Sequence, residues 1–191
     1  MIQSSNFDQQ FKQINFSEEY LTGFEFDECT FHNCSFANCD LSNVNFLNCD
    51  FEGCNLTMAQ LTNTGMKDVR FKNCKLVGLD FGLCNDFLFQ VGFISCQLDY
   101  ALFTQKKMKK TEFRDCSLKE VDFTDCDLVE SVFTNCQLDD ATFFHTNLEK
   151  ADFRSAVNFD FDPDENRIKN ARFSLFGLSG LLRKYGIRIE G

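Results

Sequence analysis

A large apolar residue recurs at every fifth position of this sequence, in two long blocks. An α-helix repeats its faces every 3.6 residues and a β-strand every 2.0, so neither element explains a period of five. A short fixed period predicts a repeat architecture whose units stack on a continuous core. The first block consists of Phe11, Phe16, Leu21, Phe26, Phe31, Phe36, Leu41, Phe46, Phe51, Leu56, Leu61, Met66, Phe71, Leu76 and Phe81. The second consists of Phe93, Leu98, Phe103, Met108, Phe113, Leu118, Phe123, Leu128, Phe133, Leu138, Phe143, Leu148 and Phe153.

A small residue usually stands two positions before each large one, and cysteine is frequent there. Alternate residues of an extended segment point the same way, so we expect both side chains of each pair to face the interior. Cysteine behaves at such a position as a small hydrophobe. We therefore predict reduced core thiols in a cytoplasmic protein. A zinc site is the alternative, but no CxxC pair or partner histidine supports it. The eleven cysteines are Cys29, Cys34, Cys39, Cys49, Cys54, Cys74, Cys84, Cys96, Cys116, Cys126 and Cys136.

The second block indicates how many sides each coil has. Phe alternates there with a non-aromatic residue without exception. Three sides per coil would place Phe above Leu, whereas four sides place Phe above Phe and allow the rings to stack. We therefore predict an all-β rod of about eight four-sided coils, stacked about 4.8 Å apart. The position two residues after each large residue holds Asn in much of the first block and Asp or Glu in the second, which suits a tight corner.

The segments CTFHNCSFANCDL (29–41) and VDFTDCDL (121–128) carry this pattern most clearly. They resemble the pentapeptide-repeat family, and the resemblance extends over about residues 11–173. It implies a right-handed quadrilateral β-helix, in agreement with the four-sided coil. We expect residues 1–173 to form this solenoid and residues 174–191 to form a C-terminal capping or dimerisation segment.

Two segments break the period, at 82–92 and 155–167. Between Phe81 and Phe93 the chain fits two steps of six residues through Phe87, with Phe89 partly exposed or under a corner; an exposed aromatic patch is the alternative reading. Lys106 occupies one of the small interior positions. Because a buried charge is costly, we expect Lys106 to turn outward and distort its coil.

The C-terminal tail has a different pattern. Its spacing predicts a short helix with Gly186 at the C-cap, followed by a strand. Such a tail is too short to fold alone, so it must pack on the last coil, on a second copy, or on both. The candidate dimer residues are Leu178, Leu181, Leu182, Tyr185, Ile187 and Ile189.

No catalytic motif is apparent. His32 and His145 fall at outward positions without a phased nucleophile, and the sequence lacks a phosphate-binding loop. We expect no enzyme activity, no metal and no cofactor. The first residues do not resemble a signal peptide, and no apolar run approaches 18 residues, so no membrane span is expected. A net charge of −10 argues against direct binding to nucleic acid.

Negative charge is concentrated between residues 112 and 140. This segment contains nine acidic residues and only two basic ones, Arg114 and Lys119. A rigid acidic surface can bind a protein partner through that partner's basic residues. The alternative is an acidic surface that only keeps the rod soluble. The candidate partner-binding residues are Glu112, Asp115, Glu120, Asp122, Asp125, Asp127, Glu130, Asp139 and Asp140.

The end of the chain adds a second resemblance. Leu181, Leu182, Gly186 and Ile187 are similar to the C-terminal dimerisation module of Qnr-type and MfpA-type topoisomerase-protecting proteins. That resemblance implies a cytoplasmic homodimer that imitates DNA, binds DNA gyrase or topoisomerase IV, and lowers fluoroquinolone action. The competing hypothesis is a non-enzymatic interaction scaffold without a topoisomerase target.

Overall fold

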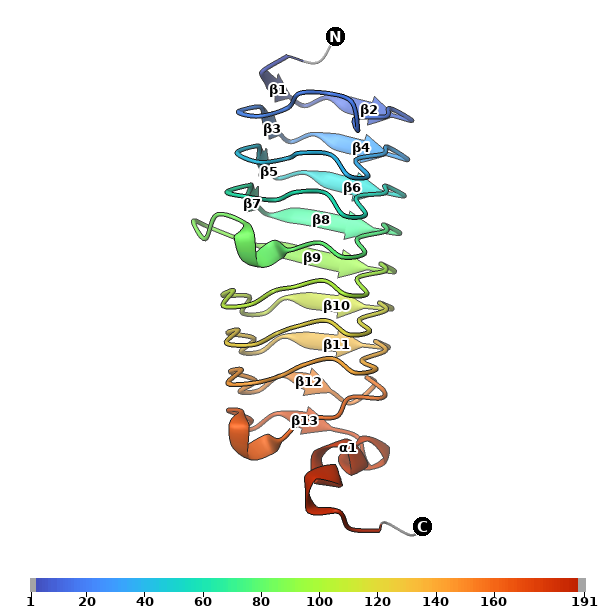
Figure 1. The fold of residues 1–191 in the computed structure, drawn as a ribbon, viewed down its shortest axis with the longest axis vertical. Coiled ribbons are helices and arrows are strands. Elements are labelled where there is room, and N and C mark those ends of the chain that lie inside the picture. Colours follow the sequence, from blue (N-terminus) through green and yellow to red (C-terminus); the bar gives the residue numbers. More distant parts are fainter. Residues whose placement is uncertain (1–2, 189–191) are drawn as a thin grey trace.

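The computed structural model describes residues 3–188, which wind into a four-sided parallel β-helix (Figure 1). Nine strands stack along one side of the rod and four along the neighbouring side of its N-terminal half. The four are β1 (Ser5–Phe7), β3 (Glu25–Asp27), β5 (Asn45–Leu47) and β7 (Gly65–Lys67). The nine are β2 (Gln10–Lys12), β4 (Thr30–His32), β6 (Asp50–Glu52), β8 (Val69–Lys72), β9 (Val91–Ile94), β10 (Glu112–Arg114), β11 (Val132–Thr134), β12 (Asp152–Phe153) and β13 (Arg172–Phe173).

One coil takes 20 residues, as the alternation of Phe predicts. Phe31 pairs with Phe51, and Phe113 with Phe133, in parallel register. The coil between β8 and β9 is longer, since Phe71 pairs with Phe93. Isolated bridges on the other sides have the 20-residue step, for example from Asp122 to Thr142, except across the insert, where Asp80 pairs with Leu102.

The core consists of side-chain columns that run the length of the rod. In the longest, Phe113 stacks on Phe133 with ring centroids 5.0 Å apart, and Phe133 on Phe153 at 4.6 Å. The opposite column stacks Phe103 on Phe123 at 5.3 Å. Rings of the two columns meet edge to face, as Phe113 and Phe123 do at 79°. The predicted matched columns of four-sided coils are confirmed.

The corners adopt the left-handed backbone conformation that the asparagines predict. The φ angle is +52° at Asn33 and +54° at Asn73. The acidic residues of the second block occupy the same conformation, with φ of +54° at Asp115 and +60° at Glu130. Each side chain at a corner therefore projects into solvent, which explains the polar character of this position.

The small interior position also supplies a hydrogen-bond donor. The thiol of Cys126 donates to the carbonyl oxygen of Phe103 in the preceding coil at 2.8 Å. The hydroxyls of Ser131 and Thr64 make the equivalent bond to Met108 and Leu41, each at 2.8 Å. All eleven cysteines are free and buried. Burial raises the pKa of Cys126 to about 12, so this thiol stays protonated near neutral pH.

The insert between β8 and the following coils corrects one prediction. The chain forms a 3₁₀ turn, η1 (Phe81–Leu83), and then projects outward as the loop beside β9 in Figure 1. Phe87, expected to continue the interior period, is 78% exposed, and Phe89 is buried in its place. The two extra residues lie in a surface turn at Leu88, whose φ is +57°, so the buried spacing here is eight residues rather than six.

Lys106 corrects a second prediction, because it points inward. It is only 2% exposed. Its Nζ donates to the carbonyl oxygen of Cys84 at 2.5 Å and to Asp86 Oδ1 at 2.6 Å, and lies 5.2 Å from the ring centroid of Phe89. The carboxylate, the carbonyl and the ring together offset the desolvation of the ammonium group, so the Lys106 side chain remains inside the coil.

The tail packs across the last coil. It contains η3 (Leu175–Gly177), the helix α1 (Leu178–Leu182) and η4 (Arg183–Tyr185), whereas η2 (Pro163–Glu165) precedes β13 in the last coil. Gly186 ends η4 with φ of +62°, as the predicted C-cap requires. The expected strand is not formed by residues 187–188, and Ile189 lies outside the described residues. Leu181 joins the rod's core, so the helix covers the open end of the solenoid.

Candidate protein-interaction surface

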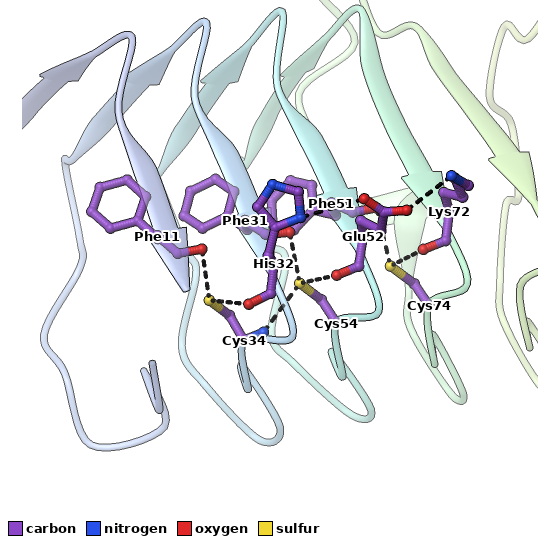
Figure 2. Close-up of polar contacts among 9 residues, drawn as sticks. All are labelled: Phe11, Phe31, His32, Cys34, Phe51, Glu52, Cys54, Lys72 and Cys74. Carbon is purple, nitrogen blue, oxygen red and sulfur yellow. Dashed lines mark hydrogen bonds and ion pairs between the residues drawn. The ribbon is translucent and has the colours of Figure 1, made fainter. Parts of the chain in front are cut away.

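The side of the rod formed by β4, β6 and β8 is a ladder of paired charges. Glu52 lies 3.3 Å from His32 Nδ1 and 2.8 Å from Lys72 Nζ, as Figure 2 shows. Arg70 contacts Asp50 through two hydrogen bonds, at 2.6 and 2.9 Å. The hydrogen bond from Lys72 lowers the pKa of Glu52. Opposite charges one coil apart offset one another, so this side does not attract a charged partner strongly.

Three of the nine candidate acidic residues are paired in the same way. Glu112 forms an ion pair with Arg114 on β10. Asp127 lies 3.3 Å from Lys109, and Glu130 lies 3.0 Å from Lys150. The hydrogen bond from Lys150 lowers the pKa of Glu130. These three carboxylates carry little uncompensated charge.

Two further candidates lie apart from the rest. Asp115, at the corner that follows β10, accepts a hydrogen bond from Asn135 at 3.0 Å. Asp125 lies at another corner, 3.8 Å from His145 Nδ1. Four successive corner residues point from four different corners of one coil. The acidic run at 112–130 therefore encircles the rod instead of lining one face.

The remaining four candidates gather along one edge of the rod. Glu120 and Asp140 occupy the same corner in successive coils, with φ of +52° and +54°. Asp139 precedes this corner, and Asp122 follows it. Asp99 completes the group one coil earlier, where it accepts hydrogen bonds from Ser117 Oγ at 2.5 Å and from the backbone N–H of Lys119 at 3.1 Å. We call this group the acidic edge; it consists of Asp99, Glu120, Asp122, Asp139 and Asp140.

Hydrogen bonds fix three of the five carboxylates of the acidic edge, those of Asp99, Asp122 and Asp139. Asp122 accepts a hydrogen bond from the backbone N–H of Thr124 at 2.8 Å, and Asp139 from Asn158 at 2.9 Å. The charge of Glu120 raises the pKa of the neighbouring Tyr100 hydroxyl. Asp99 was missed from sequence because it lies outside the dense run; the available signal was its position 40 residues, or two coils, before Asp139.

An apolar group occupies the end of the rod. Phe176 is 95% exposed, and Leu178, Tyr185 and Ile187 are also exposed, whereas Leu181 is buried in the core. Leu182 is partly buried. A hollow of about 520 Å³ separates this group from the acidic edge, lined in part by Asp140, Phe176 and Arg183. We call the exposed group the tail patch; it consists of Leu175, Phe176, Leu178, Tyr185 and Ile187.

In residues 3–188, no three His, Cys, Asp or Glu side chains are grouped so as to hold a metal ion. The same part of the chain contains no helix of the length and apolarity that a membrane span requires.

A family model described as "Pentapeptide repeat region" matches residues 24–103, 44–123 and 87–174. Together these matches cover most of the solenoid. The chain belongs to the pentapeptide-repeat family. Membership accounts for the five-residue period and for the left-handed corners. No curated protein sequence matches this pentapeptide-repeat chain significantly.

Solved structures show the same fold. A trypsin-treated variant of QnrB1, described as a plasmid-mediated fluoroquinolone resistance protein, has a TM-score of 0.65 at 19% identity and covers 98% of this chain and 92% of its own. A second trypsin-treated QnrB1 variant has a TM-score of 0.65 at 18% identity and covers 97% of this chain and 100% of its own. At this level of identity the similarity establishes the shared pentapeptide-repeat solenoid.

Proposed function

We propose that this protein binds a type II topoisomerase such as DNA gyrase, with its acidic edge occupying part of the DNA site. The observation that carries this proposal is the acidic edge itself, a group of five carboxylates along the rod, three of which are fixed by hydrogen bonds. The shared fold with a fluoroquinolone resistance protein supports the choice of partner. Binding at the DNA site would lower the action of fluoroquinolones on the enzyme.

The charge density of the acidic edge is of the order of that of DNA. From Asp99 to Asp139 the edge spans two coil steps, roughly 10 Å at a strand spacing of about 4.8 Å. One strand of B-DNA carries about three phosphates over that length, at about 3.4 Å each. The edge holds five carboxylates beside one base, Lys119; Glu120 and Asp140 are exposed, and Asp99, Asp122 and Asp139 are partly buried. A groove lined with Lys and Arg would therefore attract the edge at low salt.

The assay is DNA supercoiling by gyrase, with and without ciprofloxacin. We expect the protein to inhibit supercoiling or to relieve the inhibition by the drug. The edge variant combines Glu120→Gln, Asp122→Asn, Asp139→Asn and Asp140→Asn, and should lose this effect at least tenfold. The control combines Glu112→Gln, Asp115→Asn, Asp127→Asn and Glu130→Gln, which removes the same charge elsewhere, and should keep most of it. Equal losses in both variants would contradict a role for the edge.

We also propose that the tail patch joins two copies of the chain. Leu175 is 80% and Phe176 is 95% exposed, and large apolar side chains clustered at the end of a rod favour self-association. The pair Phe176→Asp and Leu178→Asp should convert a dimer into a monomer, as measured by light scattering. Leu88→Asp, on the insert, is the control and should leave the mass unchanged. A wild-type monomer at micromolar concentration would contradict this interface.

An interaction scaffold with another target is the second candidate. The insert has three exposed apolar side chains, Leu83, Phe87 and Leu88. They favour the scaffold, because apolar side chains do not contribute to an imitation of the charged DNA backbone. The supercoiling assay distinguishes the two functions. A protein without effect on gyrase, alone or with drug, would leave the scaffold as the better account.

A further inference from the structure

The corner that carries the acidic edge continues toward the N-terminus with apolar side chains. In five successive coils its left-handed residue is Met58, Gly78, Tyr100, Glu120 and Asp140. Backbone hydrogen bonds between the coils keep these residues in register. The corner is therefore divided into an apolar half and an acidic half over four coil steps, roughly 19 Å at a strand spacing of about 4.8 Å.

The apolar half of this corner is exposed to solvent. Met58 is 57% and Tyr100 is 55% exposed. Leu102, two residues after Tyr100, is also exposed, and it pairs with Asp80 and Asp122 in the coils on either side. We call this group the apolar corner; it consists of Met58, Tyr100 and Leu102.

Two residues of the apolar corner have a backbone conformation that does not suit them. The φ angle is +57° at Met58 and +63° at Tyr100. Asn, Asp and Gly tolerate this region best, whereas a bulky side chain is strained there. In residues 3–188 every other non-glycine residue with this conformation is polar, except Leu88 in the insert. A corner that served only the fold would hold Asn, as Asn33 and Asn73 do, so Met and Tyr here indicate a role in binding.

Neighbouring residues of the corner place these two side chains. A Cβ atom added at Gly78 would lie 2.5 Å from Met58 Sδ, so the missing side chain of Gly78 makes room for Met58. The Tyr100 hydroxyl lies close enough to Glu120 for the charge of that carboxylate to raise its pKa. Met58 therefore lies over Gly78 and Tyr100 lies toward Glu120, so the apolar side chains lead directly into the acidic ones.

We propose that the apolar corner fits an apolar recess of the partner, beside the basic groove that takes the acidic edge. This inference rests on the proposed binding of a type II topoisomerase through the acidic edge. Because apolar side chains do not imitate phosphate, they indicate a contact with the partner protein next to its DNA site. Tyr and Met are enriched in the buried centres of protein interfaces. The acidic half favours fast, oriented encounter, and the apolar half slows dissociation.

The test replaces the apolar side chains by the residue that the corner conformation favours. The corner variant combines Met58→Asn and Tyr100→Asn. The insert variant, Phe87→Asn with Leu88→Asn, is the control, since it removes a similar amount of exposed apolar surface elsewhere. The corner variant should unfold at the same urea concentration as wild type or at a higher one. Unfolding at a clearly lower concentration would show that these side chains stabilise the fold, and would overturn the proposal.

Isothermal titration calorimetry of gyrase with the full-length protein measures the binding, at two temperatures and two salt concentrations. The corner variant should bind at least about tenfold more weakly than wild type. Its heat-capacity change on binding should be less negative, because less apolar surface is buried. This loss should be equal at low and high salt, whereas the loss in the edge variant should shrink as salt rises. The insert variant should bind as wild type does.

The outcomes separate the apolar recess from the function on which it rests. A wild-type protein that does not bind gyrase would overturn both. Binding that the edge variant loses and the corner variant keeps would leave the role of the acidic edge intact and overturn the recess alone. Equal losses in the corner and insert variants would show a non-specific apolar contact and would also overturn the recess.

Discussion

At the scale of single residues, each interior position of the rod has to fill a small space and also satisfy a backbone carbonyl. The thiol of Cys39 does both, donating to the carbonyl of Phe16 at 3.3 Å. Thr146 does the same for Phe123 at 2.8 Å. Ala101 fills the space only, so the position tolerates the loss of its donor. This tolerance explains why Cys, Ser, Thr, Ala and Val alternate there.

Asp152 is the residue for which we expect the clearest pH dependence. It is 8% exposed and contacts Arg154 at 2.8 Å and Arg172 at 3.0 Å. The hydrogen bond from Arg154 lowers its pKa in the folded protein. Its stabilising effect is complete above the unfolded pKa of about 3.9 and is lost as the pH falls through the lower folded value.

We predict that Asp152→Asn lowers the free energy of unfolding at pH 7 by about 1–3 kcal/mol, because it removes a charged hydrogen-bond acceptor. Urea unfolding at several pH values measures the change. The difference from wild type should shrink as the pH falls through the lowered pKa of the wild-type carboxyl, where this group becomes protonated. Asp115→Asn is the exposed control and should stay within about 0.5 kcal/mol. A constant difference at all pH values would contradict the account.

At the scale of elements, the insert is an ordered projection that is held by a contact with the following coil. Lys106, in the following coil, holds it through hydrogen bonds to the Cys84 carbonyl and the Asp86 carboxylate. The sequence places Lys106 in an interior position, but the cost of burying a charge made an outward side chain the expected result. The insert supplies both the carboxylate and the ring, and neither partner is recognisable in sequence, because the insert has no repeat register.

We predict that Lys106→Met releases the insert, since the carbonyl of Cys84 loses its donor and Asp86 loses its partner. Chymotrypsin should then cleave after Phe87 at least several-fold faster, as followed by mass spectrometry. Lys107→Met, which replaces an exposed neighbour, should leave the rate unchanged. Equal rates in wild type and Lys106→Met would mean that the insert is held by other contacts.

The elements also show what the sequence predicts well. Columns such as Phe113 and Phe133 follow from a fixed period, because each coil repeats the backbone geometry of the one before it. Corner conformations, as at Asn33, follow from side-chain chemistry. The five-residue period did not predict that Phe87, in the insert, is exposed. The strand expected after Gly186 is not formed by residues 187–188. Only the coil register shows that Glu120 and Asp140 share a corner while Asp115 does not.

At the scale of the whole molecule, charge and apolar surface are divided along the rod. Residues 1–166 carry a net charge of −15, and residues 167–191 carry +5. Part of the positive charge at the C-terminal end is compensated by carboxylates of the same chain, since Arg183 contacts Asp160 at 2.5 Å. The same end bears the tail patch. A pair of rods joined there would present two acidic edges to a partner that is itself two-fold symmetric.

Competition with DNA for gyrase tests the central claim most directly. Gyrase bound to a fluorescent DNA duplex would be titrated with the protein at low salt, and release of the duplex followed by anisotropy. The account predicts that wild type and the control variant displace the duplex, that the edge variant displaces it at least tenfold less well, and that added salt weakens the effect. Binding of the protein to gyrase without any release of DNA would contradict it.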